Sequence, residues 1–397
     1  MITLLLVIIY IAFIGLGLPH SLFGSALESI RLDFGVSTDA INYVTVIISG
    51  CTVISSMLGA RLTKKFGTSR VVATSTLVAA LALLGFSFSE NLVVMCLCAV
   101  PLGLSAGATD SSLNNYIALN YSAMHMNFLH CFYGVGVMTS PYLMSIILDI
   151  STWQNGYRVI FSIQLVIAAI MFLSLPLWKK VGGVESEGED KCAKPLSYIT
   201  MAKSGTVLLD WLMCVSINAI EGVVGIWGAS YLINTHGLTE AEGAGAIVFF
   251  YAGIAGGRFL SGILSNKLSE LRLIAVGCGI MVAGVLSMLV PLRLFATVGL
   301  FLVGLGNGPI YPNIMHLTPR HFGKDYSNSL VGSQMATAYL GITVAPPIFG
   351  FLAKWISASV FPIYLAVWSA VFIVATVFFL GKIKSFNPDE AFSGSKK

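Results

Sequence analysis

Twelve long apolar runs set what this sequence of 397 residues can fold into. Each run is long enough to cross a bilayer as a helix, because ~20 residues at about 1.5 Å each span the ~30 Å hydrocarbon core. None shows the polar–apolar alternation of a membrane β-barrel strand. The sequence therefore predicts an all-α membrane protein with twelve transmembrane helices. They are expected near residues 3–27, 38–62, 69–88, 91–119, 126–150, 156–178, 204–234, 240–268, 271–290, 293–316, 326–353 and 359–382.

The composition excludes a soluble globular protein. Hydrophobic residues make up 56% of the chain and charged residues 10%, whereas soluble domains carry about 25% charged residues. The first apolar run lacks the basic start and the cleavage site of a secretory signal, so we expect an uncleaved helix. The cysteines and histidines form no CxxC or HExxH pattern. No metal site, disulfide framework or cofactor is therefore expected.

The basic residues indicate how the helices are oriented. Of the 22 Lys and Arg residues, four lie in loops on one side (Arg31, Arg158, Arg293 and Lys354), and Arg258 lies within a helix. The other 17 lie on the opposite side, which the positive-inside rule assigns to the cytoplasm. We therefore expect a multi-pass protein of the cell membrane with both termini in the cytoplasm. The positive charge then reflects the topology of the chain in the lipid bilayer, and no nucleic-acid partner is expected.

A hydrophilic stretch at residues 179–203 separates six helices from six. Its glycines, proline and mixed charges suit a linker. We expect an N-terminal half at 1–178, a cytoplasmic linker at 179–203 and a C-terminal half at 204–397. The halves are also similar to each other: MLGARLTKKFGTSRVV at 57–72 aligns with FLSGILSNKLSELRLI at 259–274. Such a six-helix repeat is typical of secondary transporters.

Over its whole length the chain resembles the major facilitator superfamily, whose two parallel halves enclose a central site. The loop ARLTKKFG at 60–67 is similar to the superfamily signature G-x-L-x-D-R-x-G, with Lys64 in the place of the Asp. The resemblance implies a secondary transporter whose halves rock around the site, and not an enzyme. It also implies an inner gate. We place in this gate Arg61, Lys64, Lys65, Arg70, Arg258 and Lys267.

Asp110 stands in the middle of the fourth apolar run, within GATDSSLNNY. A charged Asp at a helix centre costs about 2.5–3.5 kcal/mol, so such a residue usually faces the bundle interior or a water-filled cavity. Burial disfavours the charged form, which makes Asp110 a candidate proton carrier; the alternative is a packing role with Ser111. Asn114 follows at a spacing of four and shares its helix face. An acid beside an amide suits a neutral polyol.

The fifth run opens with NFLHCFYG, in which Asn127, His130 and Tyr133 follow at steps of three along one stripe. The stripe suits either substrate contact or hydrogen bonding between helices. With the motif at Asp110, it resembles the fucose permease branch, the fucose–galactose–glucose symporters. That resemblance implies that Asp110 is the protonatable, substrate-linked carboxylate. His130 then replaces the branch's Gln, and His20 replaces its helix-1 Asp as a second candidate proton carrier.

Glu221 is the other acid well inside a predicted helix, whereas Asp210 is expected near a cytoplasmic end. We expect Glu221 to share in proton coupling or to pair with a basic or amide group on a facing helix. Amides and aromatic rings also suit a sugar, which presents hydroxyl groups and an apolar face. The substrate-binding candidates of the second half are Asn218, Trp227, Asn307, Tyr311, Asn313 and Gln334.

Prolines inside three apolar runs predict interrupted helices, because proline removes a backbone donor. The breaks are expected at Pro309 and Pro312, within 341–350, and within 140–142. Interrupted helices at corresponding places of two halves point to a central binding site.

The sequence thus predicts a monomeric transporter that imports a small neutral sugar or polyol together with a proton. Three alternatives stay open: an antiporter exporting drugs or metabolites, sodium as the coupling ion, and a non-transporting sensor or lipid-handling protein on the same scaffold. The amide-rich helices favour a sugar over the broad apolar site of a drug exporter. No nucleophile–base pair, phosphate loop or metal motif indicates an enzyme.

Overall fold

The computed structural model describes residues 2–192 and 195–392, with the side chains at 38, 39, 42, 181–192, 240, 241 and 244 left out. Within these residues the protein is helical and contains no strand. Twelve segments are long and apolar enough to cross a membrane. The predicted fold class is therefore confirmed, and residues 193 and 194 of the predicted linker lie outside the described residues.

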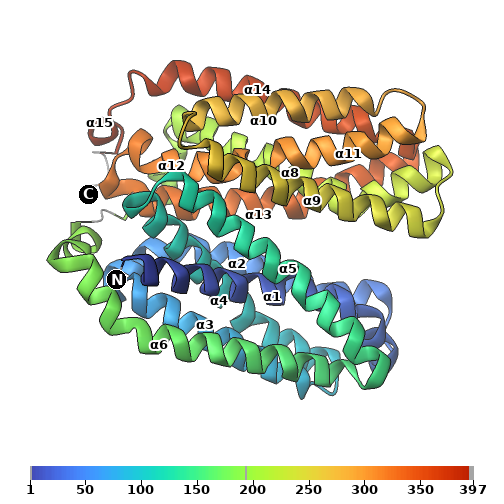
Figure 1. The fold of residues 1–397 in the computed structure, drawn as a ribbon, viewed down its shortest axis with the longest axis horizontal. Coiled ribbons are helices and arrows are strands. Elements are labelled where there is room, and N and C mark those ends of the chain that lie inside the picture. Colours follow the sequence, from blue (N-terminus) through green and yellow to red (C-terminus); the bar gives the residue numbers. More distant parts are fainter. Residues whose placement is uncertain (1, 193–194, 393–397) are drawn as a thin grey trace. The chain divides into compact units, whose positions relative to one another are not determined.

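The first six spans are single helices (Figure 1). They are α1 (Ile2–Phe34), α2 (Thr38–Phe66), α3 (Thr68–Ser87), α4 (Leu92–Asn120), α5 (Ala123–Ile150) and α6 (Trp153–Cys192). Most bounds agree with the predicted runs to within a few residues. Helix α6 is longer than predicted, since it continues into the stretch expected to be the linker.

The second set of spans includes one interrupted helix. After the short α7 (Tyr198–Ala202) come α8 (Gly205–His236), α9 (Glu240–Leu264), α10 (Glu270–Ser287), α11 (Arg293–Asn307), α12 (Ile310–Phe322), α13 (Lys324–Trp355) and α14 (Phe361–Ile383). Helices α11 and α12 together make one span. The single turn η1 (Ala358–Val360) precedes α14, and α15 (Pro388–Phe392) follows it.

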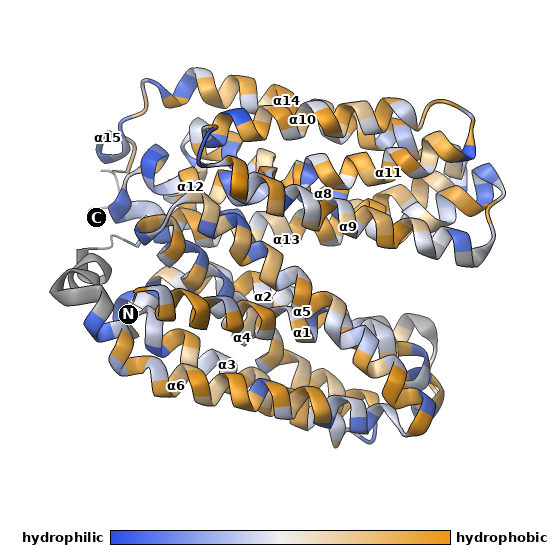
Figure 2. Cartoon of the chain, in the orientation of Figure 1, coloured by the Kyte–Doolittle hydropathy of each residue, from blue (hydrophilic) through white to orange (hydrophobic). Residues whose placement is uncertain are grey.

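The helices gather into two compact units. The first unit holds residues 1–116 and 129–195, and the second holds 117–128 and 196–397. The end of α4 and the start of α5 therefore belong to the second unit. Apolar residues dominate both sets of helices (Figure 2), and many of them are exposed on the isolated chain, as expected for surfaces that contact lipid.

Glycines let α1 and α5 approach each other closely. A Cβ atom on Gly17 would collide with the carbonyl oxygen of Tyr133, and one on Gly136 with the carbonyl oxygen of Ile14. Small residues at such crossings are a common basis of helix packing in membranes. The close crossing holds α5 in a fixed register against α1.

Helix α5 runs through Pro141, where the sequence predicted a break. Pro141 has no N–H to donate to the carbonyl oxygen of Val137 one turn earlier. The hydroxyl of Ser21 in α1 donates to this oxygen at 2.5 Å and lies 3.1 Å from the hydroxyl of Ser140. The neighbouring helix supplies the missing donor, so the chain stays helical.

Helix α13 likewise runs through Pro346 and Pro347, against the predicted break within 341–350. Two side chains donate to carbonyl oxygens of this stretch: Nε1 of Trp227 to Pro346 at 2.9 Å and the hydroxyl of Tyr364 to Ala345 at 3.0 Å. These hydrogen bonds tie the proline-containing segment of α13 to α8 and α14.

The predicted break at Pro309 is confirmed. Helix α11 ends at Asn307 and α12 begins at Ile310. Pro312 lies inside α12 and breaks nothing, because the first turn of a helix has N–H groups without intrahelical acceptors.

The start of α9 is closed by a capping box. The backbone N–H of Thr239 donates to the Glu242 carboxylate at 2.7 Å, and the Thr239 hydroxyl accepts from the Glu242 N–H at 3.2 Å. These hydrogen bonds to Thr239, the backbone one foremost, hold the pKa of Glu242 below its usual range. The box fixes where α9 begins.

We expect Ser21→Ala to lower the free energy of unfolding by about 1–3 kcal/mol, because it leaves the half-buried Val137 carbonyl without its donor. In a Pro141→Ala background the same substitution should be nearly neutral, since an alanine at this position restores the helical N–H donor. Thermal unfolding in detergent measures both. Ser25→Ala is the matched control, since the Ser25 hydroxyl donates to Leu22 of its own helix; equal losses in both backgrounds would contradict the assignment.

Candidate functional site

The first unit joins three predicted site residues in a hydrogen-bonded chain. Asp110 in α4 is 6% exposed, and its Oδ1 accepts a hydrogen bond from Nδ2 of Asn114 at 2.8 Å. Oδ1 of Asn114 lies 3.1 Å from Nε2 of His130 in α5. An amide oxygen only accepts, so the imidazole donates. The spacing of four predicted from the sequence thus links an acid through an amide to an imidazole on the next helix.

Aromatic rings from α1 surround the α5 end of this chain. The ring of Phe13 lies 5.9 Å from that of His130 and 6.5 Å from that of Tyr133, both edge-on. The ring of His20 lies 5.8 Å from that of Tyr133. Two further predicted residues, Tyr133 and His20, are therefore close to the His130 end of the hydrogen-bonded chain.

Contacts with α2 fix the position of α4. A Cβ atom on Gly107 would collide with the carbonyl oxygen of Thr52, so the backbones lie close together. The hydroxyl of Thr52 donates to the Gly103 carbonyl at 3.2 Å, and that of Ser55 to the Leu104 carbonyl at 2.5 Å. These contacts with carbonyl groups of α4, made less than two turns before Asp110, hold the carboxylate in place.

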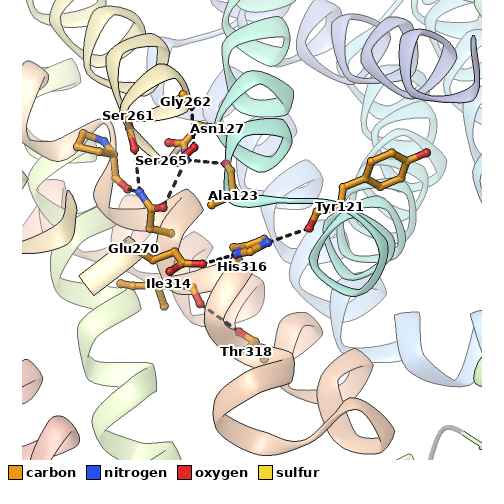
Figure 3. A network of polar contacts seen from close by, with 12 residues as sticks. Tyr121, Ala123, Asn127, Ser261, Gly262, Ser265, Glu270, Ile314, His316 and Thr318 are labelled. Atoms are coloured by element: carbon orange, nitrogen blue, oxygen red, sulfur yellow. Dashed lines mark hydrogen bonds and ion pairs between the residues drawn. The ribbon is translucent and has the colours of Figure 1, made fainter. Parts of the chain in front are cut away.

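The second unit brings together two more predicted residues, Asn127 at the start of α5 and Asn313 in α12 (Figure 3). Nδ2 of Asn313 donates to the Ser261 hydroxyl at 3.0 Å and to the Pro309 carbonyl at 2.6 Å. Nδ2 of Asn127 donates to the Ala123 carbonyl at 2.9 Å and lies 3.4 Å from Oδ1 of Asn313. Oδ1 of Asn127 is buried and has no partner among the described residues, so it can accept a hydrogen bond from a ligand.

His316 joins the same region, and the sequence analysis did not select it. Nδ1 lies 3.0 Å from Oε1 of Glu270, and Nε2 lies 2.9 Å from the carbonyl oxygen of Tyr121 (Figure 3). A carbonyl oxygen only accepts, so Nε2 donates. The contact with Glu270 then needs a further proton, on the imidazole or on the carboxyl group. The sequence signal for His316 was its position three residues after Asn313, which places the two on one helix face.

Glu221 lies beside Arg258, a basic residue on a facing helix. Such a pair was one of the two expectations for Glu221. Nη2 of Arg258 in α9 is 3.8 Å from Oε2 of Glu221 in α8, and the side chains are 10% and 23% exposed. The ion pair neutralises two charges inside the second unit. It gives Arg258, expected at the gate, a partner within its own unit.

Gln334 in α13 bridges two buried residues. Its Nε2 lies 3.0 and 2.9 Å from the two carboxylate oxygens of Asp210 in α8. Its Oε1 accepts a hydrogen bond from the Thr318 hydroxyl in α12 at 2.8 Å. Asp210 is 1% exposed. The sequence analysis placed it near a helix end and overlooked it, although a helix end inside a bundle can be fully buried.

The hydrogen bonds of two further predicted residues go to backbone carbonyl groups. Nδ2 of Asn218 donates to the Cys214 carbonyl at 2.9 Å, and Nδ2 of Asn307 to the Ile217 carbonyl at 3.0 Å. Tyr311 is buried. Their roles in substrate binding stay predictions, as does that of Trp227. The exposed members of the predicted gate are Arg61, Lys64, Lys65, Arg70 and Lys267. Within 2–192 and 195–392, no three His, Cys, Asp or Glu residues are grouped as for a metal ion.

Among the described residues, twelve helices are long and apolar enough to cross a membrane, and they form two units with buried acids, the architecture of a multi-pass membrane protein. The model of the Major Facilitator Superfamily matches residues 9–342. The chain belongs to this superfamily, whose members are transporters and not enzymes, as the sequence predicted.

Similar proteins extend over almost the whole chain. The glucose/mannose transporter GlcP of Bacillus subtilis is 23% identical over 357 residues, which cover 87% of this chain and 86% of GlcP. The proton:xylose symporter XylE, solved with 6-bromo-6-deoxy-D-glucose, matches with a TM-score of 0.78 and 12% identity over 95% of each chain. A variant of the E. coli fucose:proton symporter FucP matches with a TM-score of 0.74 and 14% identity, covering 95% of this chain and 98% of FucP. These structural matches establish the fold.

The contact between His316 and Glu270 yields a prediction that needs no substrate. In a double-mutant cycle of His316→Ala and Glu270→Ala, we expect a coupling free energy of about 1–3 kcal/mol, because each single variant leaves the other side chain without its partner. Thermal unfolding of the four proteins gives the value. Additive losses would show that the contact between the imidazole and the carboxylate contributes nothing.

Proposed function

We propose that the protein is a proton-coupled symporter that imports a small neutral sugar or polyol by alternating access. The observation that carries the proposal is the chain of hydrogen bonds from Asp110 through Asn114 to His130. The printed names of the relatives support it: GlcP is a glucose/mannose transporter, and XylE and FucP are proton symporters of xylose and fucose. An antiporter has no comparable support.

The proposed coupling follows from the hydrogen-bonding capacity of a carboxyl group. Ionised Asp110 only accepts, and Asn114 donates to it; protonated Asp110 gains an O–H donor. A sugar hydroxyl can then accept from Asp110 while His130 and Asn114 bind its neighbours. The half-buried Tyr133 offers ring surface to the C–H face of the sugar. Proton and sugar thereby favour each other's binding, and this reciprocal linkage is what symport requires.

In the second unit, Asn127 and Asn313 are the amides that we propose for sugar binding. The acceptor that Asn127 can offer is its Oδ1, which is buried and has no partner among the described residues. The halves 1–178 and 204–397 act as the moving bodies, joined by the linker 179–203. Both termini lie in the cytoplasm of a monomer in the cell membrane, and the exposed basic residues of the gate line the inner loops.

Asp110→Asn should abolish uphill sugar accumulation driven by a pH gradient while leaving exchange of sugar across proteoliposome membranes. We expect accumulation to fall by about 5- to 150-fold, because typical coupling free energies correspond to factors of this size. Asp149→Asn on the exposed end of α5 is the matched control and should accumulate normally. If Asp110→Asn still accumulates sugar, Asp110 is not the proton carrier. If a sodium gradient drives accumulation in the unmodified protein, sodium and not the proton is the coupling ion.

His130 provides a second test of the site. His130→Leu removes the donor to Asn114 and should raise the KM for transport by roughly 5- to 100-fold, whereas His130→Gln, which keeps a donor and an acceptor, should stay within about threefold. Uptake of labelled sugar at varied concentration gives both values. Equal effects of the two variants would show that His130 serves packing alone.

A further inference from the structure

Asp210 is a buried carboxyl group that the proposed transport chemistry does not use. It lies in α8 at 1% exposure. A small cavity adjoins it, lined otherwise mainly by apolar side chains such as Leu271, Ile274 and Phe379, together with His321. A carboxylate in such surroundings loses its hydration and must find compensation inside the protein.

The compensation for a negative charge at Asp210 is small. Among the residues that the structure describes, no Lys, Arg or His forms an ion pair with it. Both of its hydrogen bonds come from one amide nitrogen, Nε2 of Gln334. A carboxylate offers about four acceptor sites, so a charged Asp210 is poorly stabilised. A neutral acid needs far less.

The partners of Asp210 suit both protonation states. When Asp210 is ionised, Nε2 of Gln334 donates to it, and Oε1 of Gln334 accepts from the Thr318 hydroxyl, as observed. When Asp210 is protonated, rotation of the amide about its terminal bond lets the acid donate to Oε1 and lets Nε2 donate to the Thr318 oxygen. The Thr318 hydroxyl then donates to the Ile314 carbonyl, which already lies 3.2 Å away. Each state thus gives all three side chains a hydrogen-bond partner.

We propose that Asp210, Gln334 and Thr318 form a reversible proton-binding site in the second unit, in which rotation of the Gln334 amide accompanies protonation. The ligand is a proton and the bond formed is the O–H of the Asp210 carboxyl group. The site differs in kind from the ion pair of Glu221, where an arginine holds the charge.

The titratable groups around Asp210 allow its carboxyl group to gain and lose a proton. Cys214 follows one turn later in α8, and His321 of α12 lines the same cavity. Lys382 of α14 lies beside the first residue of α8. Helix α10 presents apolar side chains to the cavity, and its Glu270 is hydrogen-bonded elsewhere. Helix α13 presents the uncharged Gln334. Among the described residues that line the cavity, His321 is the titratable side chain besides Asp210.

Infrared difference spectroscopy of the purified full chain tests the site without any substrate. Spectra recorded between acidic and alkaline buffer should contain a C=O band of a protonated carboxylic acid that titrates. Asp210→Asn should remove this band and release about one proton per chain fewer on alkalinisation. Asp149→Asn, on an exposed position, should leave it in place. Thr318→Val keeps the shape of the side chain and should shift the band, because the amide loses its hydroxyl partner.

Two outcomes overturn the proposal. A band from Asp210 that is present at every pH would make the group a permanent hydrogen-bond donor. The absence of any band that Asp210→Asn removes would make it a permanent anion. If Asp210→Asn does not fold, the shift in Thr318→Val decides, since an unshifted titrating band then belongs to another carboxyl group.

The role of the site in transport rests on the proposed function. Sugar exchange by Asp110→Asn should keep a dependence on pH that the double variant with Asp210→Asn loses. If neither variant exchanges sugar, the result counts against the proposed sugar transport alone. The infrared band of Asp210 is measured without sugar and does not depend on that result. If sugar exchange by Asp110→Asn does not depend on pH, proton binding at Asp210 has no part in the transport cycle. That result would overturn the role of the site in transport.

Discussion

The interior of a bilayer offers no water to hydrogen-bond, and this constraint shapes every polar contact in the structure. A backbone group that a proline releases, or a polar side chain on a buried helix face, must find its partner inside the protein, on its own helix or on a neighbouring one. Ser21 satisfies the carbonyl that Pro141 frees, and Trp227 donates to the carbonyl of Pro346. Such contacts require helices that lie close together, which the glycines at the crossings allow.

The same constraint explains why two carboxyl groups are held by amides. In the first unit Asn114 links Asp110 to His130, and in the second Gln334 links Asp210 to Thr318. An amide has a donor at one end and an acceptor at the other, so it can reverse when the carboxyl group gains a proton. A carboxyl group that must exchange a proton within hydrocarbon is well served by this arrangement.

The fold was predictable from hydropathy alone, because the thickness of the bilayer dictates helix length and spans are long and strongly apolar. The link between Asp110 and Asn114 was predictable too, since a spacing of four places residues on one helix face. Contacts between helices were not. The continuity of α5 at Pro141 depends on a hydroxyl of α1, far away in the sequence. The burial of Asp210 depends on how α8 packs against α12 and α13, which no local pattern encodes. The superfamily model recognises most of the chain, yet it assigns no role to any of these residues.

The partners of the membrane-embedded acids distinguish their chemistry. At Glu221 an arginine lies beside the carboxylate, and the two opposite charges form an ion pair. Beside an amide alone, as at Asp210, neither form is strongly favoured by charge, and a small change in hydration or packing can shift the balance. Alternating access is such a change, since it alters which helices shield a group from water. A transporter can therefore place charge-holding acids at structural positions and amide-held acids where protons must bind and leave. The ion pair of Glu221 holds α8 against α9, and a part of Glu221 in proton coupling stays a prediction. The amide-held Asp110 and Asp210 are the groups to which the two proposals assign proton binding.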